Sequence, residues 1–232
     1  DTASVTVLRA FSLWSPKVEA YSLKLGGVLN EHFLRSELDV ALVREVVFSK
    51  VRDALAGSLN WIKDCSELET LDVGRASSKS LRDCHGLAHK WTSLRSFSAR
   101  CAKDDPECDS GLQGLLMPAV HDVTLEEFPL PDVIVFLRRA DSLRRVSLEF
   151  VASQPLQDSD WSELSQVIAG LSCLRIVEVV VRGCGHHDTR LVGGCLKQAR
   201  GWKFQWDDSW VDANQRTARY WGKRVMKKVW PP

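Results

Sequence analysis

A six-residue pattern with apolar side chains at positions 1, 4 and 6 recurs through most of this 232-residue sequence. Its clearest copies are LETLDV from Leu68, LRRVSL from Leu143 and LRIVEV from Leu174. All copies together begin at residues 18, 43, 68, 94, 120, 143, 174 and 201. A period of about 26 residues indicates a repeat architecture, in which each unit buries its apolar face against its neighbours.

Each copy has the alternation of a short strand, because the side chains at positions 4 and 6 point to the same face of it. Between the copies, apolar residues at helical spacing predict helices over residues 49–65, 80–91, 132–140 and 162–171. A strand followed by a helix, repeated, predicts an α/β solenoid with a curved parallel sheet inside and helices outside. We expect about eight irregular repeats of ~26 residues over residues 18–211.

The two ends of the chain differ from the repeats. Residues 1–17 are expected to form an N-terminal cap or linker, and residues 212–232 a basic amphipathic helix. In that helix Ala213, Thr217, Trp221 and Val225 recur at steps of four beside a stripe of cations. We expect the helix to cap the last repeat; the alternative is a basic helix that binds an acidic partner or an anionic membrane. Trp202, Trp206 and Trp210 are expected to help close the same end, with Trp206 facing inward.

The repeats resemble those of leucine-rich-repeat proteins. Their irregular, asparagine-poor form is most similar to the repeat domain of fungal F-box-type proteins, as in AVHDVTLEEFPLPDVIVFLRRADSLRRVSLEFV over residues 119–151. The resemblance implies a non-catalytic module that binds a protein or peptide on its concave face, as the substrate receptor of a ubiquitin ligase. It also implies that a segment upstream of Asp1 binds the ligase adaptor, since these residues hold no F-box.

Composition narrows the possible functions. The chain has 31 basic and 30 acidic residues, a formal net charge of +1, and 44% hydrophobic residues. This balance is typical of a folded globular protein and not of a disordered chain or of a protein that binds nucleic acid through excess positive charge. No apolar run is long enough to span a membrane.

The concave face is the expected binding surface, because strand positions 3, 5 and 7 of every repeat contribute to it. Their mixed charges and small side chains favour a protein or peptide ligand over nucleic acid. The candidate partner-binding residues are Asp72, Ser96, Ser98, Arg100, Asp122, Thr124, Glu126, Arg145, Ser147, Glu149, Glu178, Lys203 and Gln205.

Other polar clusters offer little chemistry. Cys184, His186, His187 and Asp188 carry zinc-ligand side chains, but no second ligand module completes the set, and we expect a loop between repeats. The acidic run over residues 103–109 is expected to be a solvated loop, and His85 and His89 ordinary helix residues. Because no nucleophile, phosphate-binding or dinucleotide motif is present, we expect no enzyme activity, no cofactor and no metal.

Seven cysteines without a dense framework favour reduced thiols in a cytoplasmic or nuclear protein, which we expect to be a monomer. Two alternatives remain open. One is a secreted or surface leucine-rich-repeat protein, such as an effector or receptor, with some cysteines oxidised. The other is a metal-dependent enzyme that uses the region of His186 and His187. The sequence does not identify the ligand.

Overall fold

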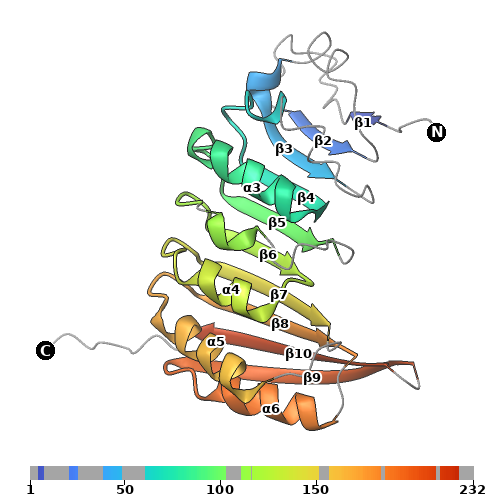
Figure 1. The fold of residues 1–232 in the computed structure, drawn as a ribbon, viewed down its shortest axis with the longest axis vertical. Coiled ribbons are helices and arrows are strands. Elements are labelled where there is room, and N and C mark those ends of the chain that lie inside the picture. Colours follow the sequence, from blue (N-terminus) through green and yellow to red (C-terminus); the bar gives the residue numbers. More distant parts are fainter. Residues whose placement is uncertain are drawn as a thin grey trace, which may run out of the picture. The chain divides into compact units, whose positions relative to one another are not determined.

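A computed structural model gives the structure of the chain, and the chain divides into two compact units, Asp1–Val123 and Thr124–Pro232. Both units are α/β, with mostly parallel strands and helices in the connections (Figure 1). The structure describes residues 5–7, 21–25, 39–48, 61–102, 111–115, 117–151, 157–183, 186–212 and 215–224. The units are treated separately below.

The strands of the first unit are β1 (Val5–Val7), β2 (Tyr21–Leu25), β3 (Val43–Phe48), β4 (Thr70–Ala76) and β5 (Ser96–Cys101), which lie side by side in that order. Strands β2 to β5 are parallel, and β1 pairs with β2 in the antiparallel direction. β1 therefore belongs to the region that the sequence predicts as a cap or linker. Strand β6 (Asp122–Glu126) spans the division between the units.

Short helices connect these strands. They are η1 (Val40–Leu42), α3 (Ser78–Leu87), η2 (Ala88–Lys90) and η3 (Leu112–Gly114). Helix α3 begins where the sequence places cap-forming serines, and the Ser77 hydroxyl accepts a hydrogen bond from the Ser80 backbone N–H at 3.3 Å. That bond satisfies one of the backbone donors that a helix start leaves unpaired. The predicted helix over residues 49–65 lies mostly outside the described residues, although Trp61 and Ile62 are helical.

The second unit contains α4 (Leu130–Leu137), β7 (Arg145–Val151), α5 (Asp158–Gly170), β8 (Ile176–Arg182), α6 (His186–Lys197), β9 (Trp202–Asp212) and β10 (Gln215–Arg224). Pro131 is accommodated in the first turn of α4, where its missing N–H removes no helical hydrogen bond. Asp158 and Asp160 place negative charge in the first turn of α5, at the positive end of the helix dipole. The predicted helices in these two connections are confirmed.

The apolar spacing places the core correctly in both units. In the first unit the position-4 and position-6 side chains of β3, β4 and β5 expose at most 2% of their surface. These side chains are Val46, Phe48, Leu71, Val73, Phe97 and Ala99. In the second unit the equivalent Val146, Leu148, Val177 and Val179 are fully buried. The strands that the repeat predicts are therefore confirmed, and they bury the predicted face.

The predicted C-terminal helix is wrong, because Gln215–Arg224 form strand β10. β10 lies between β8 and β9 and is antiparallel to both (Figure 1). The apolar residues at steps of four concealed a period of two: Arg219 and Trp221 are exposed, whereas Tyr220 and Gly222 are buried. Hydrogen bonding to a strand on each side favours the extended structure of this segment more than its local helical pattern favours a helix.

The loop predicted around His186 to Asp188 is also wrong, because these residues start helix α6. Gly193 and Gly194, which suggest a turn in the sequence, lie inside that helix. A Cβ on Gly193 would come within 3.2 Å of the Tyr220 ring, so this glycine lets α6 approach β10 closely. The sequence signal for helix α6 is weak because two adjacent glycines reduce helix propensity.

Trp202, the first of the three clustered tryptophans, is buried and stacks on Phe204 with ring centroids 6.0 Å apart. The burial of Trp202 agrees with the core position expected for it; whether it closes a repeat stays a prediction. The side chains of Trp206 and Trp210 lie outside the described residues.

Candidate functional site

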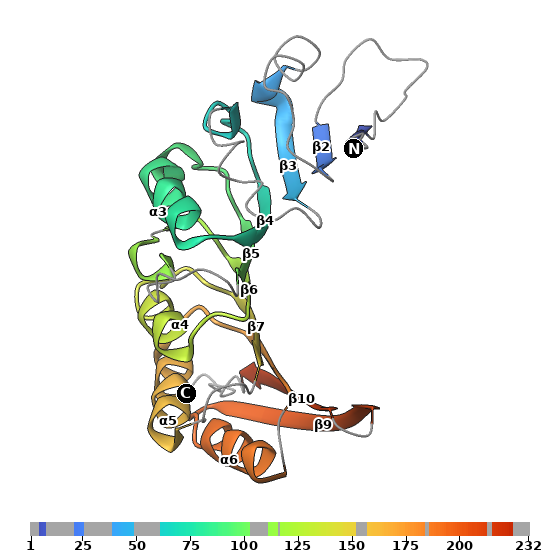
Figure 2. The same cartoon turned by 45° about the vertical axis from the view of Figure 1, so that its right-hand side comes forward.

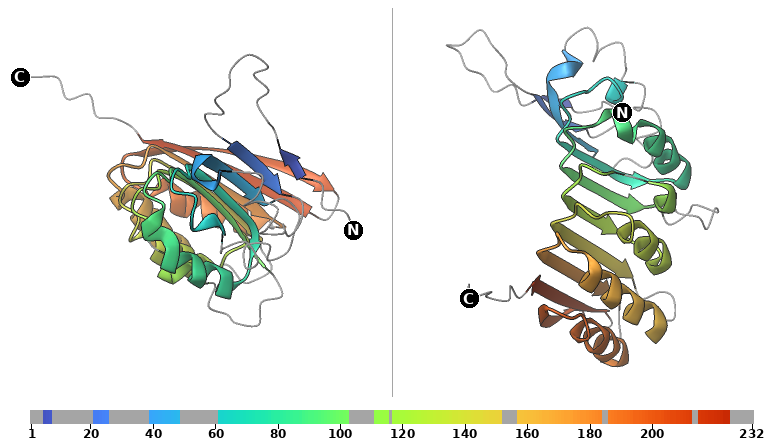
Figure 3. Two further views of the ribbon diagram at one scale, coloured as in Figure 1. Left: turned by 90° about the horizontal axis from the view of Figure 1, so that it is seen from above. Right: turned by 90° about the vertical axis from the view of Figure 1, so that its left-hand side faces the viewer.

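The candidate site is, in each unit, the face of the strands that carries no described helix. In the second unit α4 and α5 lie on the opposite side of the strands (Figure 2), and Figure 3 shows the same arrangement from above. All thirteen candidate residues belong to strands and are exposed or half-buried, and none is buried. Asp72, Ser96, Ser98, Arg100 and Asp122 lie in the first unit, and the others lie in the second.

In the first unit, strand pairing brings Asp72 beside Ser98 and Thr70 beside Ser96. Further along this face the Ser22 hydroxyl donates a hydrogen bond to the Glu45 carboxylate on the adjacent strand. Small polar and acidic side chains thus predominate where these strands pair, and Lys24 and Arg100 add positive charge to the same face.

Asp72 has a distinctive environment within this face. Its Oδ1 accepts a hydrogen bond of 2.9 Å from the Gly74 backbone N–H, at a bulge in β4. Burial raises the pKa of the Asp72 carboxyl, although the hydrogen bonds from Gly74 and from the Ser98 side chain oppose that rise. Burial therefore outweighs hydrogen bonding, and the folded chain holds this proton more tightly than the unfolded chain does.

That raised pKa predicts a pH-dependent difference between the wild type and Asp72→Asn. Stability from the protonated Asp72 is fully present below its unfolded pKa and is lost as pH rises through its higher folded pKa. We therefore expect the unfolding free energy of the wild type, relative to Asp72→Asn, to fall as pH rises from below the usual carboxyl pKa through the higher pKa of the folded chain. Urea unfolding at several pH values measures this. The exposed residue Asp122 provides the control variant Asp122→Asn. If the stability difference between wild type and Asp72→Asn changed no more with pH than the difference for this control, the prediction would be contradicted.

In the second unit the register assembles a larger surface than the sequence predicts. Ser147 lies beside Glu178, and Trp221 of β10 lies between Glu178 and Gln205. One step along, the row across the strands is Arg145, Ile176, Lys223 and Lys203. Lys203 and Gln205 therefore share a face with Arg145 and Glu178, as predicted, but β10 separates them from β8.

Trp221 and Arg219 are the functional candidates that the sequence analysis missed. Trp221 exposes 54% of its surface, and Arg219 is also exposed. The alternation of exposed and buried residues in β10 could have revealed both, but the step-of-four pattern in the same segment obscured it. On the same face Glu149 pairs with Arg182 at 2.8 Å and is itself largely covered.

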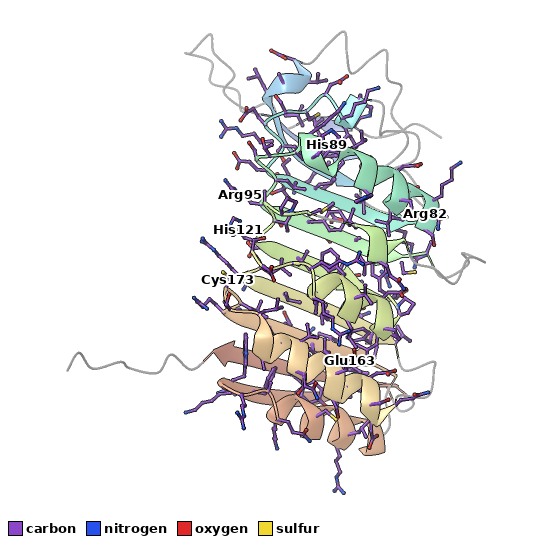
Figure 4. The ribbon with its side chains drawn as sticks, turned by 60° about the vertical axis from the view of Figure 1, so that its left-hand side comes forward. Arg82, His89, Arg95, His121, Glu163 and Cys173 are labelled. Atoms are coloured by element: carbon purple, nitrogen blue, oxygen red, sulfur yellow. The ribbon has the colours of Figure 1, made fainter. Side chains whose placement is uncertain are left out.

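A small pocket of about 270 Å³ opens elsewhere in the first unit. It is lined by His89, Trp91, Thr92, Leu94 and residues 117–120, and Figure 4 labels His89 after helix α3. Most of these side chains are apolar, and pockets that hold small ligands are generally larger and combine several convergent polar groups. We assign no ligand to it.

The thiols do not form a reactive centre in the described part of the chain. Cys65, Cys84, Cys173 and Cys195 carry free thiols. Burial raises the pKa of Cys65 and of Cys84 to about 12, so both remain protonated and unreactive at neutral pH. Cys173 is exposed in the turn before β8 (Figure 4).

Within the described ranges no group of three or more His, Cys, Asp or Glu side chains could hold a metal ion. His85 and His89 are both exposed, as expected of surface residues. The side chains of His186, His187 and Asp188, together with Cys184 and the acidic run over 103–109, lie outside the described residues. Among the described helices, none has the length and hydrophobicity to cross a bilayer.

Comparison of the sequence with models of known protein families and with curated proteins gives no match.

Proposed function

We propose that this protein is a non-catalytic recognition module of the leucine-rich-repeat type, which binds a protein or peptide on the helix-free face of the strands in each unit. The observation that carries the proposal is the partition of side chains in the repeated strands. Positions 4 and 6 of strands β3 to β8 are buried, whereas all thirteen candidate residues on the other face are exposed or half-buried. Such a face presents a row of variable side chains on a rigid backbone, which suits protein recognition.

The character of these faces also favours a protein ligand. They mix acidic, basic, hydroxyl and amide side chains, and in the second unit they include one widely exposed tryptophan. Exposed tryptophans frequently anchor protein interfaces. A nucleic-acid-binding surface would carry mostly cations, because phosphates dominate such contacts.

Charge reversal tests the proposal. The triple variant Arg145→Glu, Asp122→Lys, Glu178→Lys changes the helix-free faces of both units, and Lys79→Glu with Lys197→Glu changes exposed residues of α3 and α6. Each substitution should alter stability by only about 0.5 kcal/mol, because none of these side chains is buried. The amount of each protein captured should fall about tenfold with the triple variant and stay unchanged with the helix-side control.

Mass spectrometry of the captured proteins, with circular dichroism to verify folding, gives the measurement. If the folded triple variant captured the same proteins in the same amounts as the wild type, the helix-free faces would not be the binding surface. The proposal would then fail.

The resemblance to F-box-type proteins extends the proposal to a cellular role. The captured proteins would be substrates of a ubiquitin ligase, and this module would select them. In that case they should accumulate in cells that lack this protein, and the triple variant should not restore their turnover. Unchanged levels of every captured protein would leave recognition in place and remove the ligase role.

A further inference from the structure

We propose that the helix-free face of the second unit binds an acidic, extended polypeptide segment, with Trp221 as the apolar anchor and Arg145 and Lys203 as partners for its carboxylates. This inference rests on the proposed recognition function and names the chemistry of its ligand. It begins from strand β10, which interrupts the series of parallel strands and brings Trp221 between β8 and β9 on this face.

Trp221 provides the apolar contact. It exposes 54% of its surface, and Ile176, at 36%, lies on the neighbouring strand one step along the same face. These are the large hydrophobic side chains that stand out as exposed within the described residues. An exposed tryptophan beside an exposed isoleucine offers apolar area that a partner side chain could remove from water.

Basic residues flank Ile176 in one row across the strands. The register places Arg145, Ile176, Lys223 and Lys203 opposite one another on four adjacent strands. Arg145 and Lys203 are exposed, and Arg144 and Arg175, also exposed, precede the same ends of β7 and β8. At a strand spacing of about 4.8 Å the row is about 14 Å long, which an extended segment of about five residues could follow.

The acidic residues of this face do not cancel its positive charge. Glu149 is paired with Arg182, and the Glu149 side chain exposes only 13% of its surface. Glu178 is half-buried beside Trp221, and Asp207 occupies a register position opposite Arg219. The exposed charge near Trp221 is therefore mainly positive and complements an acidic ligand.

A polypeptide fits these observations better than a nucleic acid. Glu178 next to Trp221 would repel a phosphate approaching the aromatic ring, whereas a peptide can place a neutral side chain there. A peptide also combines carboxylates and an aliphatic side chain within the short length of the cationic row.

The experiment uses the whole chain and labelled ten-residue peptides in which a central leucine is flanked by glutamates. Fluorescence anisotropy measures their affinity at low and high salt. Matched peptides carry lysine in place of glutamate, or serine in place of leucine, and a single-stranded DNA oligonucleotide is the nucleic-acid probe. We expect the acidic leucine peptide to bind at least about tenfold more tightly than each of these three probes, and more weakly at high salt.

Variants of the chain locate the binding. Trp221→Ala and the double variant Arg145→Glu, Lys203→Glu should each weaken the acidic leucine peptide by about tenfold or more. Trp221→Phe should retain more affinity than Trp221→Ala, and Lys197→Glu, on the helix side of the same unit, should bind as the wild type does. Unchanged unfolding midpoints show that the variants are folded.

Three results would overturn the inference: equal affinity for acidic and basic peptides, tighter binding of the oligonucleotide, or undiminished binding by folded Trp221→Ala and Arg145→Glu, Lys203→Glu variants. If these occur while the triple charge-reversal variant still loses its captured proteins, the proposed function holds and only the ligand chemistry is wrong. If the triple variant also keeps its captured proteins, both proposals fail.

Discussion

Replacing Trp161 by alanine is expected to reduce the free energy of unfolding of the second unit by about 3–5 kcal/mol, which is the usual cost of truncating a buried tryptophan. Trp161 of α5 is completely buried and meets Phe150 of β7 edge to face, with ring centroids 5.2 Å apart. The truncation would remove this contact between helix and sheet and leave a cavity. Urea unfolding followed by circular dichroism measures the loss.

Two phenylalanine variants provide a matched comparison. Within the described residues the Trp161 indole Nε1 has no hydrogen-bond partner, whereas Nε1 of the equally buried Trp91 donates to the Ile62 carbonyl at 3.2 Å. Trp91→Phe removes this hydrogen bond, while the Ile62 carbonyl keeps the one from the Cys65 backbone N–H at 3.0 Å. The lost bond costs about 0.5–1.5 kcal/mol, which Trp161→Phe avoids. We therefore expect Trp91→Phe to be the more destabilising. A Trp161→Ala variant as stable as the wild type would contradict the packing described for α5.

Replacing Gly74 by alanine is expected to destabilise the first unit by about 2–4 kcal/mol, since two separate penalties combine. Gly74 has a φ of +58°, a left-handed conformation that glycine adopts without strain. An added Cβ would also lie 2.5 Å from the Phe48 carbonyl oxygen, and the backbone of β3 would have to shift to relieve the contact. β3 pairs with β4 close to this point, so the shift would weaken the sheet.

Gly86→Ala is the control for this substitution. Gly86 belongs to α3, and an added Cβ there would meet no other atom within 4 Å. Alanine has the higher helix propensity, so this change should be neutral or stabilise by up to about 1 kcal/mol. Chemical denaturation of both variants gives the comparison, and equal stability of Gly74→Ala and Gly86→Ala would refute the proposed strain at the β4 bulge.

Much of the local structure could be predicted because one face of each repeated strand is buried. Leu71 and Val73, or Val177 and Val179, show in the sequence the alternation that they have in the sheet. Ser77 before α3 and Pro131 in the first turn of α4 are recognisable signals of a helix start. A repeated apolar pattern thus predicts both the strands and the core, because the apolar residues of each strand are the ones on its buried face.

The C-terminal part of the second unit could not be predicted for physical reasons. Whether residues 215–224 become helix or strand depends on β8 and β9, which offer backbone hydrogen bonds on both sides. Gly222 accommodates the ring of Phe204, since an added Cβ would lie 2.5 Å from it. Such a contact between strands is invisible in the local sequence.

The candidate site shows the same division. The sequence places the thirteen residues on one face of their strands, because strand alternation alone decides that. It could not place Trp221 among them, since the neighbours of Trp221 depend on which strands pair. The position of Trp221 on this surface thus depends on tertiary structure, whereas the positions of the polar residues around it could be predicted from the repeat.

The position of β10 between β8 and β9 has a consequence for how the chain is completed during vectorial synthesis. β9 is made before β10, yet among the described strands it is hydrogen-bonded to β10 alone. β8 can pair with β7 as soon as both have emerged, while β9 must wait for a strand that has not yet been translated. The order of synthesis therefore differs from the order in the sheet after β8, and β9 can join the sheet only together with β10 or after it.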